Sequence, residues 1–150
     1  MLTEKVKKDM QDALKSKDEL RLSVLRGALS EFTNALVAAK KKPTDQLDDK
    51  EALAVFKRLA KQRKESIEQF TKGNRPELAE KELKELAIIE EYLPEQASKE
   101  QIEEVAKAKM QEMNVTDKSK MGQLMGAIMK ELDGNADGTV VKEVVEELLP

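Results

Sequence analysis

The sequence contains no cysteine and no histidine among its 150 residues. The absence of cysteine excludes disulfides, thiolate nucleophiles and cysteine-ligated zinc sites. The absence of histidine removes the commonest general base and the commonest transition-metal ligand. Acid–base chemistry is left to Asp, Glu, Lys and the single tyrosine. These absences disfavour an enzyme without excluding one.

Aromatic residues and long apolar runs are also scarce. Aromatic residues make up 3% of the chain and charged residues 38%, a profile typical of helical proteins and poor for a β-sandwich. No stretch approaches the ~20 apolar residues that a membrane span requires. The first residues, Met1 to Lys5, contain no apolar secretory core. We therefore expect a cytoplasmic protein that has no membrane segment.

The charge is unevenly distributed along the chain. Residues 1–93 hold 20 Lys and Arg against 18 Asp and Glu, a balance of +2. Residues 94–150 hold 7 against 12, a balance of −5, and together they give the net charge of −3. An acidic protein is a poor non-specific coat for nucleic acid, which needs an overall basic surface. A local basic stripe can still make a specific contact.

Apolar residues recur every three or four positions along almost the whole chain, which is typical of amphipathic helices. Asp18, Ser98 and Asp137 are suited to cap helices, and Ser98 with Gln101 forms the sequence pattern of a capping box. Thr116 or Asp117 is the expected cap of the sixth helix. We predict an all-α, multihelical fold with seven helices. The apolar stripes run from Leu2 to Leu14, Leu22 to Ala39, Ala52 to Phe70, Ala79 to Leu93, Ile102 to Met113, Met121 to Leu132 and Val141 to Leu148.

The segment around Pro94 is a candidate domain boundary, because the charge balance changes sign there. We predict an N-terminal four-helix subdomain at 1–94 and a small C-terminal three-helix tail subdomain at 95–150. The short Gly73–Asn74 connection implies that the third and fourth helices form an antiparallel hairpin. The division leaves each subdomain with a thin core of modest stability.

Residues 133–138 fit the first six positions of an EF-hand calcium loop. The motif also needs a bidentate Glu at position twelve, where this sequence has Val144. Glu143 lies one residue early, which turns its carboxylate away by about 100° on a helix. Asp137 as a helix cap explains these residues without an ion. We predict no metal site, and nothing in the sequence indicates a cofactor.

Two glycines, Gly122 and Gly126, lie four residues apart in the sixth predicted helix. A glycine in a helix interior lowers the stability of the helix by about 1 kcal/mol relative to alanine, so the presence of two glycines here calls for an explanation. We favour close packing of another helix; the alternative is an open face for a ligand or nucleic-acid backbone. Lys118 and Lys120 at the helix start could hold phosphates beside its free amide groups, with Lys130 farther along. These five residues are a candidate nucleic-acid site.

A lysine stripe on the third predicted helix is a second candidate phosphate-binding site. Its members align within about 40° by the helical rotation, with Arg58 to one side. Glu68 lies four residues after the last lysine, and a plain solvated face is the favoured alternative. The stripe consists of Lys50, Lys57, Lys61 and Lys64.

Arg63 interrupts the apolar face of the same helix. We predict that it pairs with Glu82 or Glu85 on the fourth helix, with a ligand-binding arginine as the alternative. The sequence shows no nucleophile–base pair and no glycine loop that could cradle phosphates. Glu90 and Glu91 are adjacent, so they point in different directions on a helix. We predict no catalytic residue.

Five short sequence motifs, given at the end of this paragraph in chain order, resemble those of the YqeY family. The domain of this family also occurs at the C-terminus of the GatB subunit of the glutamyl/aspartyl-tRNA amidotransferase. Each motif alone is weak, but their order and spacing are specific and cover essentially the whole chain. They are Arg21-Leu22-Ser23-Val24-Leu25-Arg26, Lys61-Gln62-Arg63-Lys64-Glu65-Ser66, Glu91-Tyr92-Leu93-Pro94-Glu95-Gln96, Met121-Gly122-Gln123-Leu124-Met125-Gly126 and Gly134-Asn135-Ala136-Asp137-Gly138.

The resemblance implies two helical subdomains and a role in tRNA recognition. In the amidotransferase this domain is a mobile tRNA-binding appendage, and the chemistry lies in a catalytic portion that this chain lacks. The leading hypothesis is therefore a tRNA-binding or amidotransferase-related accessory module without its own active site. The alternative is a protein–protein adaptor that uses an adaptable methionine surface of the tail, although such residues more often fill a core. The methionines are Met110, Met113, Met121, Met125 and Met129.

Overall fold

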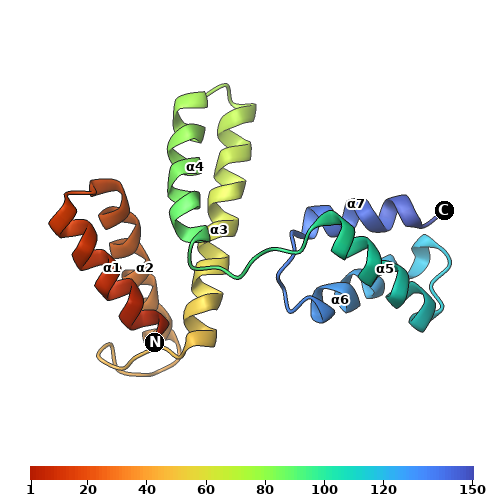
Figure 1. Cartoon of the computed structure of the whole chain (residues 1–150), viewed down its shortest axis with the longest axis horizontal. Coiled ribbons are helices and arrows are strands. Elements are labelled where there is room, and N and C mark those ends of the chain that lie inside the picture. Colours follow the sequence, from red (N-terminus) through yellow and green to blue (C-terminus); the bar gives the residue numbers. More distant parts are fainter. The chain divides into compact units, whose positions relative to one another are not determined.

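A computed structural model describes residues 1–150 and consists of seven α-helices and one 3-10 turn, without strands (Figure 1). This confirms the prediction of an all-α, multihelical fold. The helices are α1 (Leu2–Ser16), α2 (Glu19–Ala38), α3 (Asp49–Lys72), α4 (Pro76–Glu90), α5 (Lys99–Met113), the 3-10 turn η1 (Lys118–Lys120), α6 (Met121–Glu131) and α7 (Gly138–Leu148). None of them combines the length and the apolar composition that a transmembrane segment requires.

The chain forms two compact units, Met1–Leu93 and Pro94–Pro150. The first unit consists of two helical hairpins, α1–α2 and α3–α4. Lys17 ends α1 in the left-handed conformation at φ 61°, and the Asp18 carboxylate then caps α2 by accepting from the Arg21 backbone N–H at 3.1 Å. The predicted cap at Asp18 is therefore confirmed.

The α3–α4 hairpin turns at Gly73 and Asn74, and its two helices lie side by side (Figure 1). Asn74 takes the left-handed conformation at φ 57°, and Pro76 begins α4, where its missing N–H is not needed. The fourth helix ends at Glu90 rather than at Pro94. Proline disfavours the α conformation in the preceding residue, so residues 91–93 form tight turns instead.

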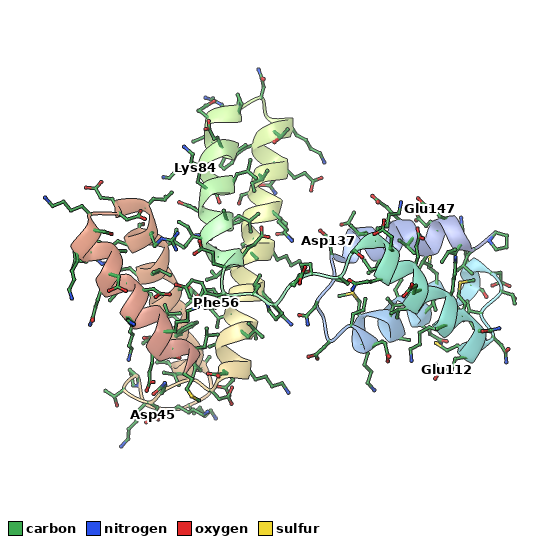
Figure 2. All side chains as sticks on the ribbon, viewed as in Figure 1. Asp45, Phe56, Lys84, Glu112, Asp137 and Glu147 are labelled. Atoms are coloured by element: carbon green, nitrogen blue, oxygen red, sulfur yellow. The ribbon has the colours of Figure 1, made fainter.

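Phe56 lies at the centre of the first unit's core (labelled in Figure 2). Its ring meets Phe32 of α2 edge-on at a centroid distance of 5.5 Å and stacks on Tyr92 at 4.8 Å. Aromatic contacts of these geometries contribute about 0.5–1.5 kcal/mol each beyond the buried area. They hold α2, α3 and the segment after α4 together.

In the tail unit, α5, α6 and α7 enclose a separate apolar core of Ile, Val, Leu and Ala side chains. The capping box predicted at Ser98 and Gln101 is present, and Asp137 caps α7 by accepting from the Thr139 backbone N–H at 2.8 Å. Val144, which occupies the twelfth position of the calcium-like loop, is fully buried in this core. That position therefore packs the tail and offers no ligand.

The start of the sixth helix differs from the prediction. Asp117 does not cap α6; it caps η1, by accepting hydrogen bonds from the backbone N–H and the hydroxyl of Ser119. As a result α6 begins only at Met121, and Lys118 and Lys120 lie in the 3-10 turn that leads into it.

Candidate nucleic-acid interface

Both glycines of α6 lie on an open helix face. Gly122 and Gly126 are exposed, and a Cβ atom added at either position would meet no heavy atom within 4 Å. The favoured interpretation, in which another helix packs closely against them, is therefore wrong. The remaining interpretation is a helix face whose backbone a ligand can approach.

Three lysines border this open face, and none of them forms an ion pair. Lys118 and Lys120 lie exposed on η1, and Lys130 lies exposed in the last turn of α6. Gly126 is turned by about 40° from Gly122 around the helix axis, and Lys130 by about 40° more, so the three share one side. We call Lys118, Lys120, Gly122, Gly126 and Lys130 the α6 face.

The carboxylates adjacent to the α6 face are hydrogen-bonded or ion-paired to residues outside that face. Asp117 accepts hydrogen bonds from the Ser119 side chain and backbone, which lower the pKa of its carboxyl, and the charge of Lys120 also lowers that pKa. Glu131 lies 3.5 Å from the Lys109 ammonium on α5. Lys109 also bonds to Glu112, and that hydrogen bond is the main cause of its raised pKa. The α6 lysines thus keep their charge available although the tail is acidic overall.

The N-terminus of α6 adds positive potential at the same place. No side chain caps its first turn, and that turn contains no acidic residue. The backbone N–H groups of a first helical turn lack partners within the helix, and the helix dipole is positive there. In α6 the N–H of Met121 is already bonded to the Lys118 carbonyl of η1, which leaves the amides that follow it. Amide groups of this kind bind phosphate and carboxylate oxygens. Together with the lysines of η1, they can hold the oxygens of a phosphodiester.

The methionines of the tail pack largely inward. All five of the residues considered for an adaptor surface are half-buried and pack against the core of the tail unit. Methionine fills irregular gaps in small cores, and this arrangement uses it in that way. The methionines of the tail are thus accounted for by its packing.

The predicted α3 lysines belong to the other compact unit. Lys61 and Lys64 are exposed and Lys57 is half-buried, and all three lie along one side of α3. Beside them, Arg58 bonds to Glu31 of α2 at 2.6 Å. The structure therefore gathers the α6 candidates on one helix and its leading turn, and it places the α3 candidates on a separate surface.

Arg63 forms the predicted ion pair with the fourth helix. Its Nε lies 3.2 Å from Glu85 and 3.6 Å from Glu82, and the three side chains are only 15–25% exposed. Nε is buried and has no hydrogen bond of acceptable geometry, so the contact is electrostatic. Because both carboxylates come from the adjacent helix of the hairpin, we assign Arg63 to the stability of the fold.

A polar cluster around Tyr92 was not predicted from the sequence. The Tyr92 hydroxyl donates to Asp9 of α1 at 2.5 Å, and Arg21 of α2 makes two hydrogen bonds to Glu91 at 2.5 and 3.2 Å. Burial, and then the bond to Asp9, raise the pKa of the Tyr92 phenol above its ordinary value. Helical periodicity cannot pair residues that lie 70 to 83 positions apart. The cluster ties the end of α4 to α1 and α2.

Several curated proteins from fungi are similar to this chain. The Lachancea thermotolerans protein named "altered inheritance of mitochondria protein 41, mitochondrial" is 41% identical over 90 residues, covering 59% of this chain and 46% of that protein. A Pyrenophora tritici-repentis protein of the same name is 29% identical over 147 residues, covering 94% and 77%. An uncharacterized protein of Schizosaccharomyces pombe is 40% identical over 93 residues, covering 62% and 72%. The chain spans about half the length of several of the curated relatives that it matches.

The expectation of a cytoplasmic protein is contradicted by these relatives. Those from Lachancea thermotolerans, Kluyveromyces lactis and Pyrenophora tritici-repentis are named as mitochondrial proteins. The expectation had rested on the lack of a secretory segment and of a membrane span, and neither feature distinguishes the cytoplasm from an organelle interior.

The family assignment extends over nearly the whole chain. A family model described as Yqey-like protein matches residues 3–149, which extend over both compact units from the second residue of α1 to the end of α7. The resemblance drawn from the sequence motifs is thereby confirmed. Because this match covers far more than half of its length, the chain belongs to the Yqey-like protein family.

Proposed function

We propose that this protein binds structured RNA, with tRNA as the leading candidate, through the α6 face. The observation that carries the proposal is the open position of Gly122 and Gly126 beside three lysines that form no ion pair. The resemblance to the C-terminal domain of a tRNA amidotransferase subunit supports RNA as the ligand. The proposal concerns recognition only and assigns no reaction to the chain.

The chemistry of the α6 face suits a phosphodiester backbone. Without side chains at positions 122 and 126, a sugar–phosphate strand can approach the helix backbone closely. Lysines bordering that approach supply sequence-independent phosphate contacts, which fix register and orientation. The −5 balance of residues 94–150 repels RNA at a distance. Binding should therefore be moderate and strongly dependent on salt.

A salt titration of tRNA binding by the full chain tests the proposal. Labelled tRNA is followed by fluorescence anisotropy at several salt concentrations, and the logarithm of the association constant is plotted against the logarithm of salt. Lys118→Ala combined with Lys120→Ala should weaken binding and flatten the slope by about one unit per lost phosphate contact. Lys142→Ala, which removes an exposed lysine of α7 outside the α6 face, is the matched control and should change the slope little.

Substitutions at Gly126 test the need for an open face. Gly126→Leu should weaken tRNA binding by blocking the approach, while circular dichroism verifies that the helices remain. Gly126→Ala adds only one methyl group and serves as the folding control. If the wild-type protein shows no salt-sensitive tRNA binding at low ionic strength, the RNA proposal is wrong. An RNase-resistant protein partner captured by the tail would then favour the adaptor function.

A further inference from the structure

The α2 helix carries an interior glycine, Gly27, that resembles those of α6 in its surroundings. Gly27 is exposed, and a Cβ atom added there would meet no heavy atom within 4 Å. By the helical rotation, Ser30 and Asn34 lie within about 60° of it on the same side of α2. Both are exposed, so this side of α2 presents mainly small or polar groups, with the exposed Val37 near its C-terminal end.

An ion pair joins this side of α2 to the lysine stripe of α3. Glu31, one turn after Gly27, accepts from Arg58 of α3 at 2.6 Å and from Asn34 at 3.5 Å. Arg58 precedes Lys61, a member of the lysine stripe, by one helical turn of α3. The open side of α2 and the lysine side of α3 therefore meet at the Glu31–Arg58 pair and form one surface. We call it the α2–α3 face; it comprises Gly27, Ser30, Glu31 and Asn34 of α2 with Lys50, Lys57, Arg58, Lys61 and Lys64 of α3.

The charge of the α2–α3 face is positive over a considerable length. Lys50 and Lys64 are 14 residues apart, which corresponds to about 21 Å along a helix. Neither Lys50 nor Lys61 forms an ion pair, and Glu68, on the same side beyond Lys64, is bonded to Lys72 at 2.9 Å. Two carboxylates lie within the face: that of Glu31, which is occupied by Arg58, and that of Glu65, one turn after Lys61. The net field favours an extended polyanion.

The composition of the face distinguishes between kinds of polyanion. Protein interfaces depend on aromatic or aliphatic anchors at their centre, whereas the exposed aliphatic side chain on this side of α2, Val37, lies near the end of the helix. Single-stranded nucleic acid is bound mainly by stacking its bases on exposed aromatic rings. Phe32, Phe56 and Tyr92 are buried and Phe70 is half-buried, so the chain exposes no aromatic platform. A base-paired stem, which presents phosphates and hydroxyls on its outside, is the remaining partner.

We propose that the α2–α3 face binds the phosphate backbone of a base-paired RNA stem, as a second contact surface in addition to the α6 face. This inference rests on the proposed RNA-binding function and specifies the form of the RNA. The lysines contact the phosphates, Ser30 and Asn34 offer hydrogen bonds to phosphate or 2′-hydroxyl oxygens, and Gly27 lets the backbone come close. The contact carries no sequence preference, because no side chain of the face reaches into a groove as an anchor.

The test compares a double-stranded RNA stem with a single-stranded RNA of equal phosphate number, using the full chain. The stem should bind more tightly than the single strand, and different stem sequences should bind equally. Lys50→Gln with Lys61→Gln should flatten the salt slope for the stem by about one unit per lost contact, with no loss of helix content by circular dichroism. Lys81→Gln, an exposed lysine of α4 outside the face, is the matched control. Gly27→Leu should weaken stem binding, whereas Gly27→Ala should preserve the fold.

The possible failures are distinguishable from each other. If RNA binds with a steep salt slope and the Lys50 and Lys61 substitutions leave it unchanged, this inference is wrong and the α6 face alone carries binding. Tighter binding of the single strand would overturn the assignment to stems. If no RNA binds at low salt, the proposed function itself fails, and this inference fails with it.

Discussion

Replacing the α6 glycines by alanine should make the protein more stable. Glycine in a helix interior is about 0.8–1 kcal/mol less favourable than alanine, chiefly because it loses more backbone freedom on folding. Neither Gly122 nor Gly126 has a positive φ, and neither site has a neighbouring heavy atom that a methyl group would meet. No steric cost therefore opposes the gain in helix propensity.

The magnitude differs between the two positions. Gly126 is in the middle of the eleven residues of α6 and should give nearly the full gain, about 1 kcal/mol. Gly122 is the second residue of the helix, where propensity matters less, so we expect about half as much. For a domain as small as the tail unit, Pro94–Pro150, a gain of 1 kcal/mol corresponds to a rise in melting temperature of about 4–8 °C.

Urea denaturation followed by circular dichroism measures this gain, with hydrogen exchange of the α6 amides as a local probe. Gly73→Ala is the contrasting variant, because its Cβ would lie 3.2 Å from the Gln69 carbonyl oxygen and should give no gain. A Gly126→Ala protein less stable than the wild type would refute the reasoning. It would mean that the α6 face is covered in solution and is not free for a ligand.

Three further outcomes follow from particular contacts. Arg63→Ala should destabilise the chain by about 1–3 kcal/mol, between the values typical of exposed and of buried pairs, because Glu85 would lose its partner; equal urea midpoints for variant and wild type would contradict this. In alkaline titrations monitored by near-ultraviolet absorbance, the single tyrosine, Tyr92, should ionise well above pH 10. Because the phenol of the unfolded chain loses its proton at a lower pH than that of the folded chain, the contribution of Tyr92 to the free energy of unfolding is complete below about pH 10 and decreases at higher pH. Ionisation at the ordinary pH would show that Tyr92 does not bond to Asp9. Calorimetry with calcium should show no micromolar binding at residues 133–144, because the twelfth position is a buried valine.

The fold could be predicted from the sequence because its determinants are local. The apolar period of each helix and the caps at Asp18, Ser98 and Asp137 depend on residues at most four positions apart. Arg63 could also be paired with the fourth helix, because a short hairpin turn fixes which residues face each other. Where the prediction failed locally, at the start of α6, a serine hydroxyl competed for the Asp117 carboxylate and held a 3-10 turn.

The candidate site could be predicted only in part, because its properties depend on tertiary neighbours. The sequence indicates that two glycines inside a helix, Gly122 and Gly126, lower its stability and so call for an explanation. Only the fold shows that no other helix packs against them. Gly27 carries the same signal, a glycine inside a long helical pattern, and only the fold shows that it too lies on an open side of its helix. The Glu31–Arg58 contact joins residues 27 positions apart on different helices, which periodicity does not align.

The most direct test of RNA recognition by the α6 face is a nuclear magnetic resonance titration of the 15N-labelled full chain with tRNA. The amide signals of Gly122 and Gly126 report on the proposed contact itself, and those of residues 118–120 report on its positive border. We expect that tRNA shifts or broadens these signals at low salt, that added salt reverses the effect, and that the Lys118→Ala, Lys120→Ala protein shows much less of it. Binding of tRNA that leaves residues 118–130 unperturbed would contradict the assignment of the α6 face.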